Sequence, residues 1–518
     1  MIVRGQQGCP RAERLALEKE NLMCKIRLVL ATLTVMLVIQ PAVADGRRDA
    51  TRNQDLADGS QLVEAALPAV GDTAGFAIAV RDDLLVVGAP NVDPGYPPGP
   101  GQVFVHNWDV DTRQWDYSGE LSSLLPEGTL HDDSFFGFAV DIYDHPIDGV
   151  RVIVGAPMAL NESGVETGRV FVFRRSILGM WTLEQILDNS NESPNGRFGE
   201  RVALSETLAF ITAGGETNET GGTGTVWSSV LGREGEQRVV RMPRVRGDVL
   251  GMFGSGLDYD GGVLVIGAAE SVVGGVACGQ AHVYSSDDDF PIHVQTLNVP
   301  GVWNVDTANF GFSVAVDVGD GDGTLLVGTP SHNPSITGGA VSYALDTTWI
   351  QQDLLVGSDP QPVQLLGHSV ALMGGRAVAG APYGGLALSG HAVVFEYSPS
   401  AEEWRVDATL TPEMASVLDF SGHSVAVGPV GVMVGSPYLD TDSGDQTGGV
   451  FAYFHNDDGW QSDTRPIAST LGSRHVIANP TWTEESQASF GASIALSDNT
   501  AIIGDPTGDA DGRVHLYT

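Results

Sequence analysis

A repeated unit constrains this chain more than any other feature of its sequence. Residues 310–330 show it most completely, as F-G-F-S-V-A-V-D-V-G-D-G-D-G-T-L-L-V-G-T-P. A Phe-Gly pair opens an alternating apolar segment, a turn follows, and a second apolar run ends in Gly-Ala-Pro or a variant. The unit recurs eight times, and its closing glycines stand 52 to 69 residues apart. This spacing fits one four-stranded blade with long loops. The closing glycines are Gly88, Gly155, Gly214, Gly267, Gly328, Gly380, Gly435 and Gly504.

Alternating apolar residues and turn residues divide most copies into four strands. Copies three and four have altered closing motifs, Ala213-Gly214-Gly215 and Gly267-Ala268-Ala269, and copy eight lacks a fourth strand. Residues 60–67, S-Q-L-V-E-A-A-L, have the length and alternation to supply that strand. We therefore predict an all-β propeller of four-stranded antiparallel blades, closed by the N-terminal strand in the last blade. The predicted number is eight, or seven if an altered copy is not a blade.

The Phe-Gly…Gly-Ala-Pro pattern resembles the FG-GAP repeat family, which forms the propeller head of integrin α chains and occurs in secreted bacterial proteins. The aromatic residues that carry it here are Phe136, Phe198, Phe253, Phe310 and Phe490. The resemblance covers nearly all of the chain after residue 57. It implies a propeller fold and adhesion or matrix contact, although one fold hosts many activities.

The N-terminus has the features of an export signal. From Met23 a short basic region precedes an apolar run and small residues at a cleavage point after Ala44. We interpret residues 1–22 as an over-extended start, 23–44 as a signal peptide, 45–57 as a flexible segment and 58–518 as the propeller. The apolar run is shorter than the roughly 20 residues of a spanning helix, so we predict a periplasmic or secreted protein without a membrane span. Cys278 is the one cysteine after the signal peptide, so the mature chain has no disulfide.

The chain is strongly acidic, with 65 Asp and Glu against 27 Lys and Arg and a formal net charge of −38. Such a surface repels nucleic-acid phosphates and anionic membranes, and it attracts divalent cations. Nucleic acid and membrane surfaces are therefore excluded as expected partners.

In integrin-like copies the turn between the first two strands carries a calcium loop, D-x-D-x-D-G-x-x-D. Its best match here is Asp317, Asp320 and Asp322, in a loop one residue shorter and without the last Asp. A looser candidate is Asp141, Asp144 and Asp148. Alternating carboxylates around a glycine-bent turn can supply the oxygens that Ca²⁺ requires. Solvated turns are the alternative for every acidic loop of this chain.

Two copies read G-H-S-V-A, close to the G-x-S-x-G nucleophile motif. Ser369 and Ser424 occupy an ordinary repeat position, so they do not indicate catalysis, whereas His368 and His423 are candidates to line a ligand surface. We found no catalytic motif, and we expect a non-enzymatic protein that binds a protein or glycan. The expected binding loops are residues 91–100, 158–167, 331–337 and 438–447. A hydrolase or lyase acting at the central channel and a structural envelope component are the alternatives.

Overall fold

A computed structural model describes much of the propeller region. The described residues are 60–63, 76–81, 84–90, 99–109, 114–145, 149–176, 178–189, 193–217, 221–232, 239–242, 251–286, 290–319, 323–331, 337–359, 364–385, 388–411, 419–428, 431–436, 449–456, 459–462, 476–478, 492–497, 500–505 and 513–517. They all belong to one compact unit, residues 40–518. The predicted signal peptide and the segments before it lie outside these residues. Among the described residues, no helix has the length and apolar character needed to cross a membrane.

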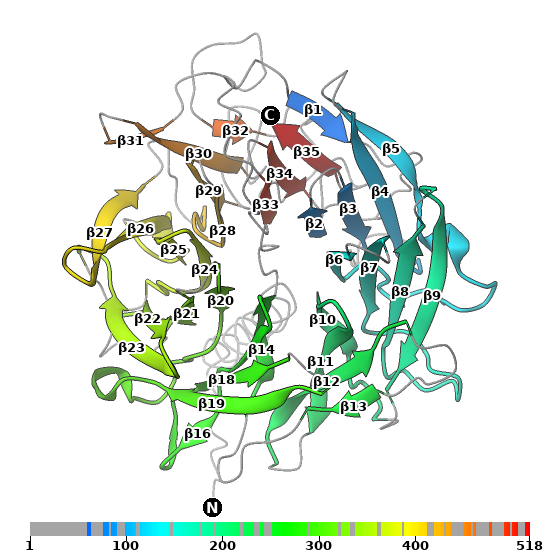
Figure 1. Cartoon of the computed structure of the whole chain (residues 1–518), viewed down its shortest axis with the longest axis horizontal. Helices are drawn as coiled ribbons and strands as arrows, with labels where there is room; N and C mark the ends of the chain where they lie inside the picture. The colour runs from blue at the N-terminus through cyan, green and yellow to red at the C-terminus, as the bar shows by residue number, and fades with distance from the viewer. Residues whose placement is uncertain are drawn as a thin grey trace, which may run out of the picture. The chain divides into compact units, whose positions relative to one another are not determined.

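Within the described residues, the main strands form eight antiparallel sheets of four strands each, numbered here as sheets 1 to 8 in chain order (Figure 1). Sheets 1 to 4 contain β2 (Ala77–Arg81), β3 (Leu84–Ala89), β4 (Gln102–Asp109) and β5 (Gln114–Glu120); β6 (Ala139–His145), β7 (Gly149–Ala156), β8 (Arg169–Arg175) and β9 (Trp181–Asp188); β10 (Phe198–Leu204), β11 (Leu208–Thr217), β12 (Thr223–Val230) and β13 (Val239–Arg241); and β14 (Phe253–Asp260), β15 (Val263–Ala268), β18 (Gln280–Ser285) and β19 (Ile292–Asn298). Sheets 5 to 8 contain β20 (Val314–Asp317), β21 (Thr324–Thr329), β22 (Gly339–Leu345) and β23 (Trp349–Leu355); β24 (Ser369–Met373), β25 (Arg376–Ala381), β26 (His391–Ser398) and β27 (Glu403–Leu410); β28 (Ser424–Val427), β29 (Gly431–Ser436), β30 (Gly449–Asn456) and β31 (Gly459–Ser462); and β33 (Ser493–Ser497), β34 (Thr500–Asp505), β35 (Arg513–Tyr517) and β1 (Ser60–Val63).

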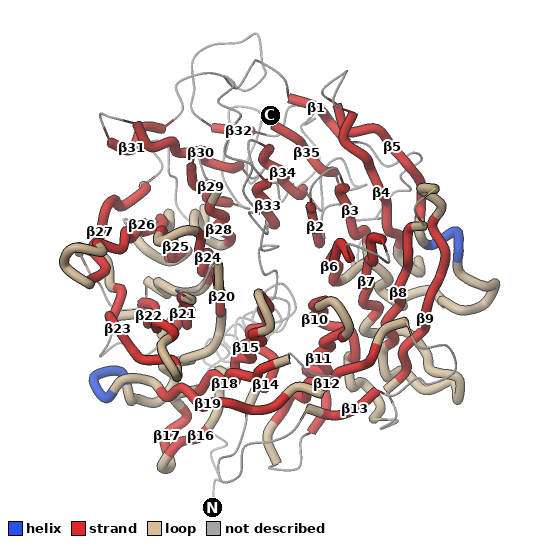
Figure 2. Tube along the Cα trace, in the orientation of Figure 1, coloured by secondary structure: helices blue, strands red, loops and turns tan. Residues whose placement is uncertain are grey.

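The remaining elements are small. Strand β32 (Val476–Ala478) pairs with β30, and β16 (Val272–Val273) and β17 (Val276–Ala277) form a hairpin between β15 and β18. Two single-turn helices, η1 (Ser122–Leu124) and η2 (Gly301–Trp303), lie in loops (Figure 2). The all-β class of four-stranded antiparallel sheets, predicted from the sequence, is confirmed.

The first strand of each sheet lies innermost and contacts the first strand of the next sheet (Figure 1). Strand β33 of sheet 8 also contacts β2 of sheet 1. The N-terminal strand β1 pairs antiparallel with β35, so that Ser60 lies opposite Tyr517 and Val63 opposite Val514. Stable closure of the sheets into one ring in solution stays a prediction.

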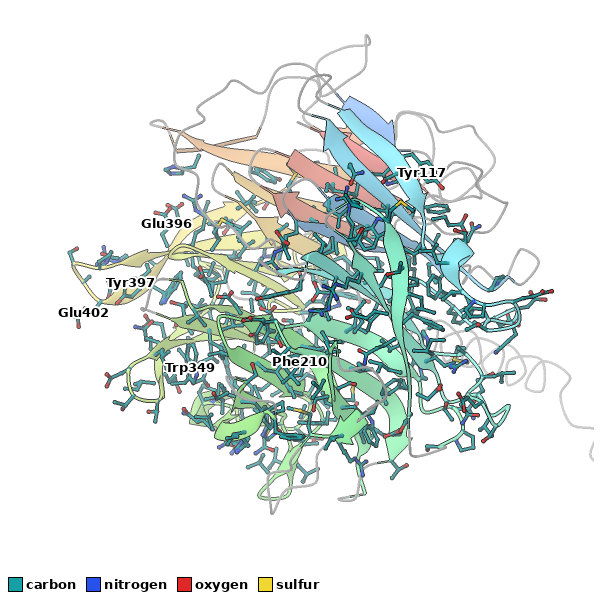
Figure 3. All side chains as sticks on the ribbon, turned by 45° about the vertical axis from the view of Figure 1, so that its right-hand side comes forward. Tyr117, Phe210, Trp349, Glu396, Tyr397 and Glu402 are labelled. Carbon is teal, nitrogen blue, oxygen red and sulfur yellow. The ribbon has the colours of Figure 1, made fainter. Side chains whose placement is uncertain are left out.

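The repeat motif packs at the contacts between sheets. Phe136 is fully buried in a cluster that combines Val103 and Val105 of sheet 1 with Phe171 of sheet 2. The two motif glycines allow neighbouring backbones to approach, because a Cβ on Gly155 would lie 2.0 Å from the carbonyl oxygen of Gly199. Large buried side chains such as Phe210 make up the core, whereas Tyr117 lies on the outer strand β5 (Figure 3).

Copy three forms a full sheet, but in a different register from the one read in the sequence. Phe198 lies opposite Ala213 just as Phe253 lies opposite Ala268 in sheet 4, so Thr212 occupies the place of the motif glycine. The assignment of Gly214 to this place was wrong. The hydroxyl of Thr212 accepts a hydrogen bond from the backbone N–H of Arg201 at 2.9 Å. The predicted register was wrong because Ala213-Gly214-Gly215 resembles a Gly-Ala-Pro motif that is displaced by two residues along the chain.

Candidate functional site

The chain makes the same turn at the start of the first strand in six of the described sheets. The residue before the motif aromatic position has a positive φ of 52° to 58°, and its carbonyl accepts the N–H of the residue three positions later at 2.9 to 3.1 Å. Positive φ is uncommon for residues other than glycine. The residues that have this positive φ at the repeated turn are Phe135, Arg197, Met252, Asn309, Leu365 and Phe420. The turn is constant while these side chains vary, so the six sheets present five different kinds of side chain at this position.

The residue after the motif glycine also varies from sheet to sheet, and these eight residues form what we call the entry layer. They are Phe76, Phe138, Glu200, Ser255, Phe312, His368, His423 and Ala492. Members from neighbouring sheets touch, with ring centroids 4.9 Å apart for Phe76 and Phe138 and 5.2 Å apart for both Phe312–His368 and His368–His423. The layer therefore continues across sheets along the inner strands.

Two carboxyl groups lie three residues further along the first strands, at a position where the other sheets have alanine. Asp141 on β6 and Asp258 on β14 are these residues. The alanines at this position are Ala79, Ala203, Ala315, Ala371, Ala426 and Ala495. Three residues of strand correspond to roughly 10 Å, so the carboxyl groups lie about that far from the entry layer.

Each carboxyl group accepts two backbone hydrogen bonds, one from its own strand and one from the next sheet. Asp141 accepts the N–H of Ile142 at 2.8 Å and that of Leu204 at 2.7 Å. Asp258 accepts the N–H of Tyr259 at 2.9 Å and that of Val316 at 2.8 Å. Asp141 is partly buried, whereas the Asp258 side chain is only 6% exposed.

Loss of hydration raises the pKa values of the two carboxyl groups to different extents. It raises the pKa of Asp141 to about 6, against the opposing effects of two backbone hydrogen bonds and of Arg81. It raises the pKa of Asp258 to about 8, where the charges of Asp260 and Asp141 add to the increase. At neutral pH Asp258 therefore holds its proton while Asp141 is mostly ionised. Two carboxyl groups whose surroundings separate their pKa values are the usual basis of an acid and base pair.

Only part of each predicted calcium site lies within the described residues. Asp317 accepts the N–H of Gly374 at 2.9 Å, and Asp320 and Asp322 lie outside the described residues. In the second candidate calcium site, the Asp144 side chain is exposed, and Asp141 is one of the two carboxyl groups described in the preceding paragraphs. Asp148 lies outside the described residues. Where the structure describes the chain, no group of three or more His, Cys, Asp or Glu is arranged to hold a metal. Calcium binding stays a prediction.

The repeated serines of the first strands have a structural contact. The hydroxyl of Ser369 donates to the carbonyl oxygen of Gly422 at 2.9 Å, and Ser313 donates to Gly367 at 2.8 Å in the same way. This repeated contact between sheets accounts for the serine of the G-H-S-V-A motif. His368 and His423 lie in the entry layer, and partial loss of hydration lowers the pKa of His423 to about 4.

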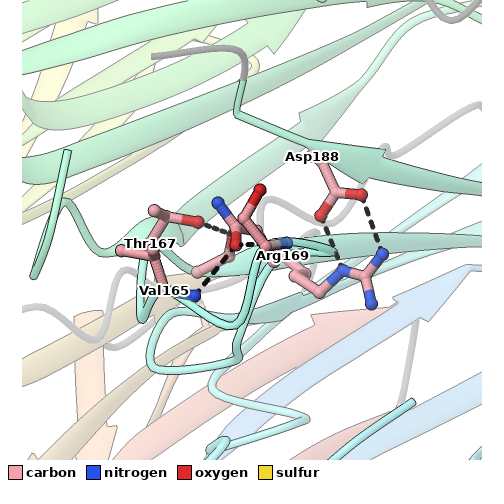
Figure 4. A network of polar contacts seen from close by, with 7 residues as sticks. Val165, Thr167, Arg169 and Asp188 are labelled. Carbon is pink, nitrogen blue, oxygen red and sulfur yellow. Dashed lines mark hydrogen bonds and ion pairs between the residues drawn. The ribbon is translucent and has the colours of Figure 1, made fainter. Parts of the chain in front are cut away.

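Of the four loops expected to bind a partner, residues 158–167 are described in full. Asn161 stabilises the turn of this loop, because its side-chain oxygen accepts the N–H groups of Ser163 at 2.9 Å and Val165 at 3.0 Å. Next to the loop, Arg169 makes a two-point ion pair with Asp188 at 2.6 and 2.7 Å (Figure 4). Residues 91–98, 332–336 and 438–447 lie outside the described residues. Contacts within the loop of residues 158–167 hold its shape, and the described part of this loop contains no cluster of reactive groups.

No protein-family model matches the chain, and no curated protein matches its sequence. Similar solved structures include the periplasmic gluconolactonase of Pseudomonas aeruginosa, with 15% identity over 64% of this chain and 84% of that one and a TM-score of 0.41. Another is a Bacteroides fragilis protein assigned provisionally as a 6-phosphogluconolactonase, with 10% identity over 76% of this chain and 94% of that one and a TM-score of 0.42.

Both neighbours are named as enzymes, and this finding contradicts the sequence-based expectation that the chain is not an enzyme. That expectation is withdrawn. At these identities and TM-scores the similarity concerns the propeller-like arrangement alone, and no substrate or residue role is carried over from either neighbour. The resemblance to FG-GAP repeats rests on the sequence motifs.

Sequence reasoning missed Asp258 and the significance of Asp141 as its counterpart. The signal was present, because aligning the eight first strands places both residues in a column that is otherwise alanine. Asp258 was not among the candidate residues, and Asp141 was grouped with the acids that follow it in sequence.

Proposed function

We propose that this protein is a hydrolase whose reaction takes place at the inner strands, with Asp141 as general base and Asp258 as general acid. The observation that carries the proposal is the replacement of alanine by aspartic acid at this one position in two sheets of eight. Six sheets pack with alanine there, so packing does not require a carboxyl group. Burying a carboxyl group costs free energy, and groups with shifted pKa values gather at functional sites.

The structural alternative is that each carboxyl group only accepts backbone N–H groups of neighbouring strands. Asp260 and Asp317 have that function further along the strands, where Asp260 accepts the N–H of Val318 at 2.7 Å. The pKa values of Asp141 and Asp258 are raised into the range of acid and base catalysis, and backbone hydrogen bonding does not account for this because those bonds lower the two pKa values.

In the proposed reaction, ionised Asp141 accepts a proton from a water molecule as the water oxygen forms a bond to the electrophilic carbon of the substrate. The bond from that carbon to the leaving oxygen breaks, and protonated Asp258 donates its proton to that oxygen. The two carboxyl groups exchange protonation states and are restored by proton exchange with solvent. The net charge of −38 favours an uncharged substrate over an anionic one.

We also propose export after cleavage near Ala44, calcium binding at Asp317, Asp320 and Asp322, and kinship of the repeat unit with FG-GAP repeats. The signal-like sequence supports the first, and the acidic loop supports the second. The buried motif aromatics and the glycine contacts between sheets support the third.

A substrate screen tests the proposed function. Residues 45–518 are assayed against uncharged chromogenic esters, lactones and glycosides, alongside Asp141→Asn and Asp258→Asn and the control Asp144→Asn on the same strand. We expect hydrolysis of at least one class, lost by about 100-fold or more in the first two variants and kept in the control. Equal activity in all four proteins would refute the assignment.

A further inference from the structure

Five ring side chains on sheets 5 to 7 form two contacting groups, which together we call the ring cluster. It consists of Phe312, His368, His423, Phe420 and Tyr383. Phe312, His368 and His423 touch in series at 5.2 Å, and the rings of Tyr383 and Phe420 lie 4.9 Å apart. The two groups are connected through the backbone, because the turn N–H of His423 donates to the carbonyl of Phe420 at 3.0 Å.

Packing alone does not account for the ring cluster. The position held by Phe312, His368 and His423 is filled by Phe76 and Phe138 in two other sheets and by Glu200, Ser255 and Ala492 in the remaining three, which have the same four-stranded form. The positions held by Phe420 and Tyr383 are partly exposed, as is His423. Three consecutive sheets therefore place rings side by side and leave three of the rings accessible.

Rings of this kind bind carbohydrate by two means. The apolar face of a sugar ring packs against an aromatic or imidazole face, and the sugar hydroxyls bond to nearby polar atoms. Tyr383 supplies a hydroxyl group, and each uncharged imidazole has Nε2 as its second polar atom, since the Nδ1 atoms of His368 and His423 are buried. Loss of hydration keeps His423 uncharged at neutral pH, since it lowers the pKa of that residue to about 4.

The surrounding charge selects against anionic sugars. The chain has a formal net charge of −38, and the two catalytic carboxyl groups lie on inner strands of the same unit. An uncharged sugar meets no repulsion from this field, whereas a sugar phosphate or uronate does.

We infer that the ring cluster is the binding subsite for an uncharged carbohydrate ring, and that the substrate of the proposed hydrolase is a neutral sugar derivative. This inference rests on the proposed function. Along the strands, three residues separate the level of the subsite from that of the carboxyl groups, which corresponds to roughly 10 Å.

Binding is measured on the double variant Asp141→Asn/Asp258→Asn, which the proposed function makes inactive. The probes are the methyl glycosides of glucose, galactose, mannose and N-acetylglucosamine, with glucose 6-phosphate and glucuronate as charged counterparts. Saturation-transfer NMR detects binding and calorimetry gives Kd. We expect at least one neutral glycoside to bind, and both charged sugars to bind about tenfold more weakly or not at all.

Substitutions taken from other sheets test the ring cluster without disturbing the turn. Phe420→Asn copies Asn309, and His423→Ala copies Ala492; Tyr117→Ala on the outer strand β5 is the control. We expect the first two to weaken sugar binding about tenfold or more and the control to leave it unchanged. His423→Ser, which copies Ser255, replaces His423→Ala if that variant does not fold.

The outcomes separate the two proposals. If no neutral glycoside binds, or if the ring variants bind as tightly as the parent, the inference is overturned, even if the wild-type protein hydrolyses a non-sugar ester. Sugar binding that depends on the ring cluster upholds the subsite. If no neutral sugar derivative is then hydrolysed, the assignment of the substrate fails, and if no substrate of any class is hydrolysed, the proposed hydrolase function fails with it.

Discussion

Replacing Asp258 by Asn is expected to remove a pH dependence from the stability of the fold. The carboxyl group has a pKa of about 8 in the folded protein against an ordinary value of 3.8. The folded state thus binds a proton that the unfolded state has lost across this range. Stability contributed by this group is fully present below pH 4 and is lost as the pH rises toward 8.

The size of the effect follows from the two pKa values. Between pH 5 and pH 7.5 the carboxyl group is already ionised in the unfolded state while the folded state keeps most of its proton, so a rise in pH over this range lowers the free energy of unfolding by about 3 kcal/mol. The same calculation for Asp141, whose pKa is about 6, gives about 1 kcal/mol. Asn keeps one oxygen acceptor at each position but does not titrate.

Urea unfolding of the wild type and the variants at pH 5 and 7.5 provides the assay. The change in free energy between the two pH values is expected to be smaller by about 3 kcal/mol in Asp258→Asn and by about 1 kcal/mol in Asp141→Asn. The control Asp144→Asn, with an exposed side chain on β6, keeps the wild-type pH dependence. If Asp258→Asn also keeps it, the carboxyl group is ionised in the folded protein and the reasoning on acid catalysis fails.

Three further predictions concern the scaffold. Gly155→Ala places a methyl group 2.0 Å from a backbone oxygen of the next sheet, so it should destabilise the fold by about 3 kcal/mol in a urea melt; an unchanged midpoint would mean that the sheets are not packed this closely. Deletion of residues 45–63 removes β1 and leaves β35 as an open edge, so the melting temperature should fall and aggregation on heating should increase; unchanged melting would contradict ring closure. Calcium should raise the melting temperature of the wild type and chelator should lower it, with most of the gain lost in Asp320→Ala/Asp322→Ala; no response to either reagent would remove the calcium proposal.

The sequence alone predicted the scaffold because the scaffold is local and repeated. Each copy contains its own apolar alternation, motif aromatic and closing turn, so eight copies report the same four-stranded sheet. The register of copy three was the exception. There Ala213 and the two glycines after it match the motif when shifted by two residues, and only the pairing of Phe198 with Ala213 shows that Thr212 holds the glycine position.

The candidate site was harder to predict because it is made across sheets. Asp141 and Asp258 are separated by more than one hundred residues, and each takes its second backbone hydrogen bond from the following sheet. Tyr383 and Phe420 likewise meet only through the neighbouring positions of two sheets. The two histidines were recognised as candidate lining residues because both follow a motif glycine. The sequence alone does not show which residues of different copies lie close together in space.

The dependence of kcat/KM on pH, measured on a substrate identified in the screen, tests the central claim most directly. An ionised Asp141 and a protonated Asp258 predict a bell-shaped profile with apparent pKa values near 6 and 8 that belong to the coupled pair. Asp141→Asn should remove the acidic limb together with most of the activity, and Asp258→Asn the basic limb. A profile that stays flat from pH 5 to pH 9, or a bell that both variants retain, would contradict the account.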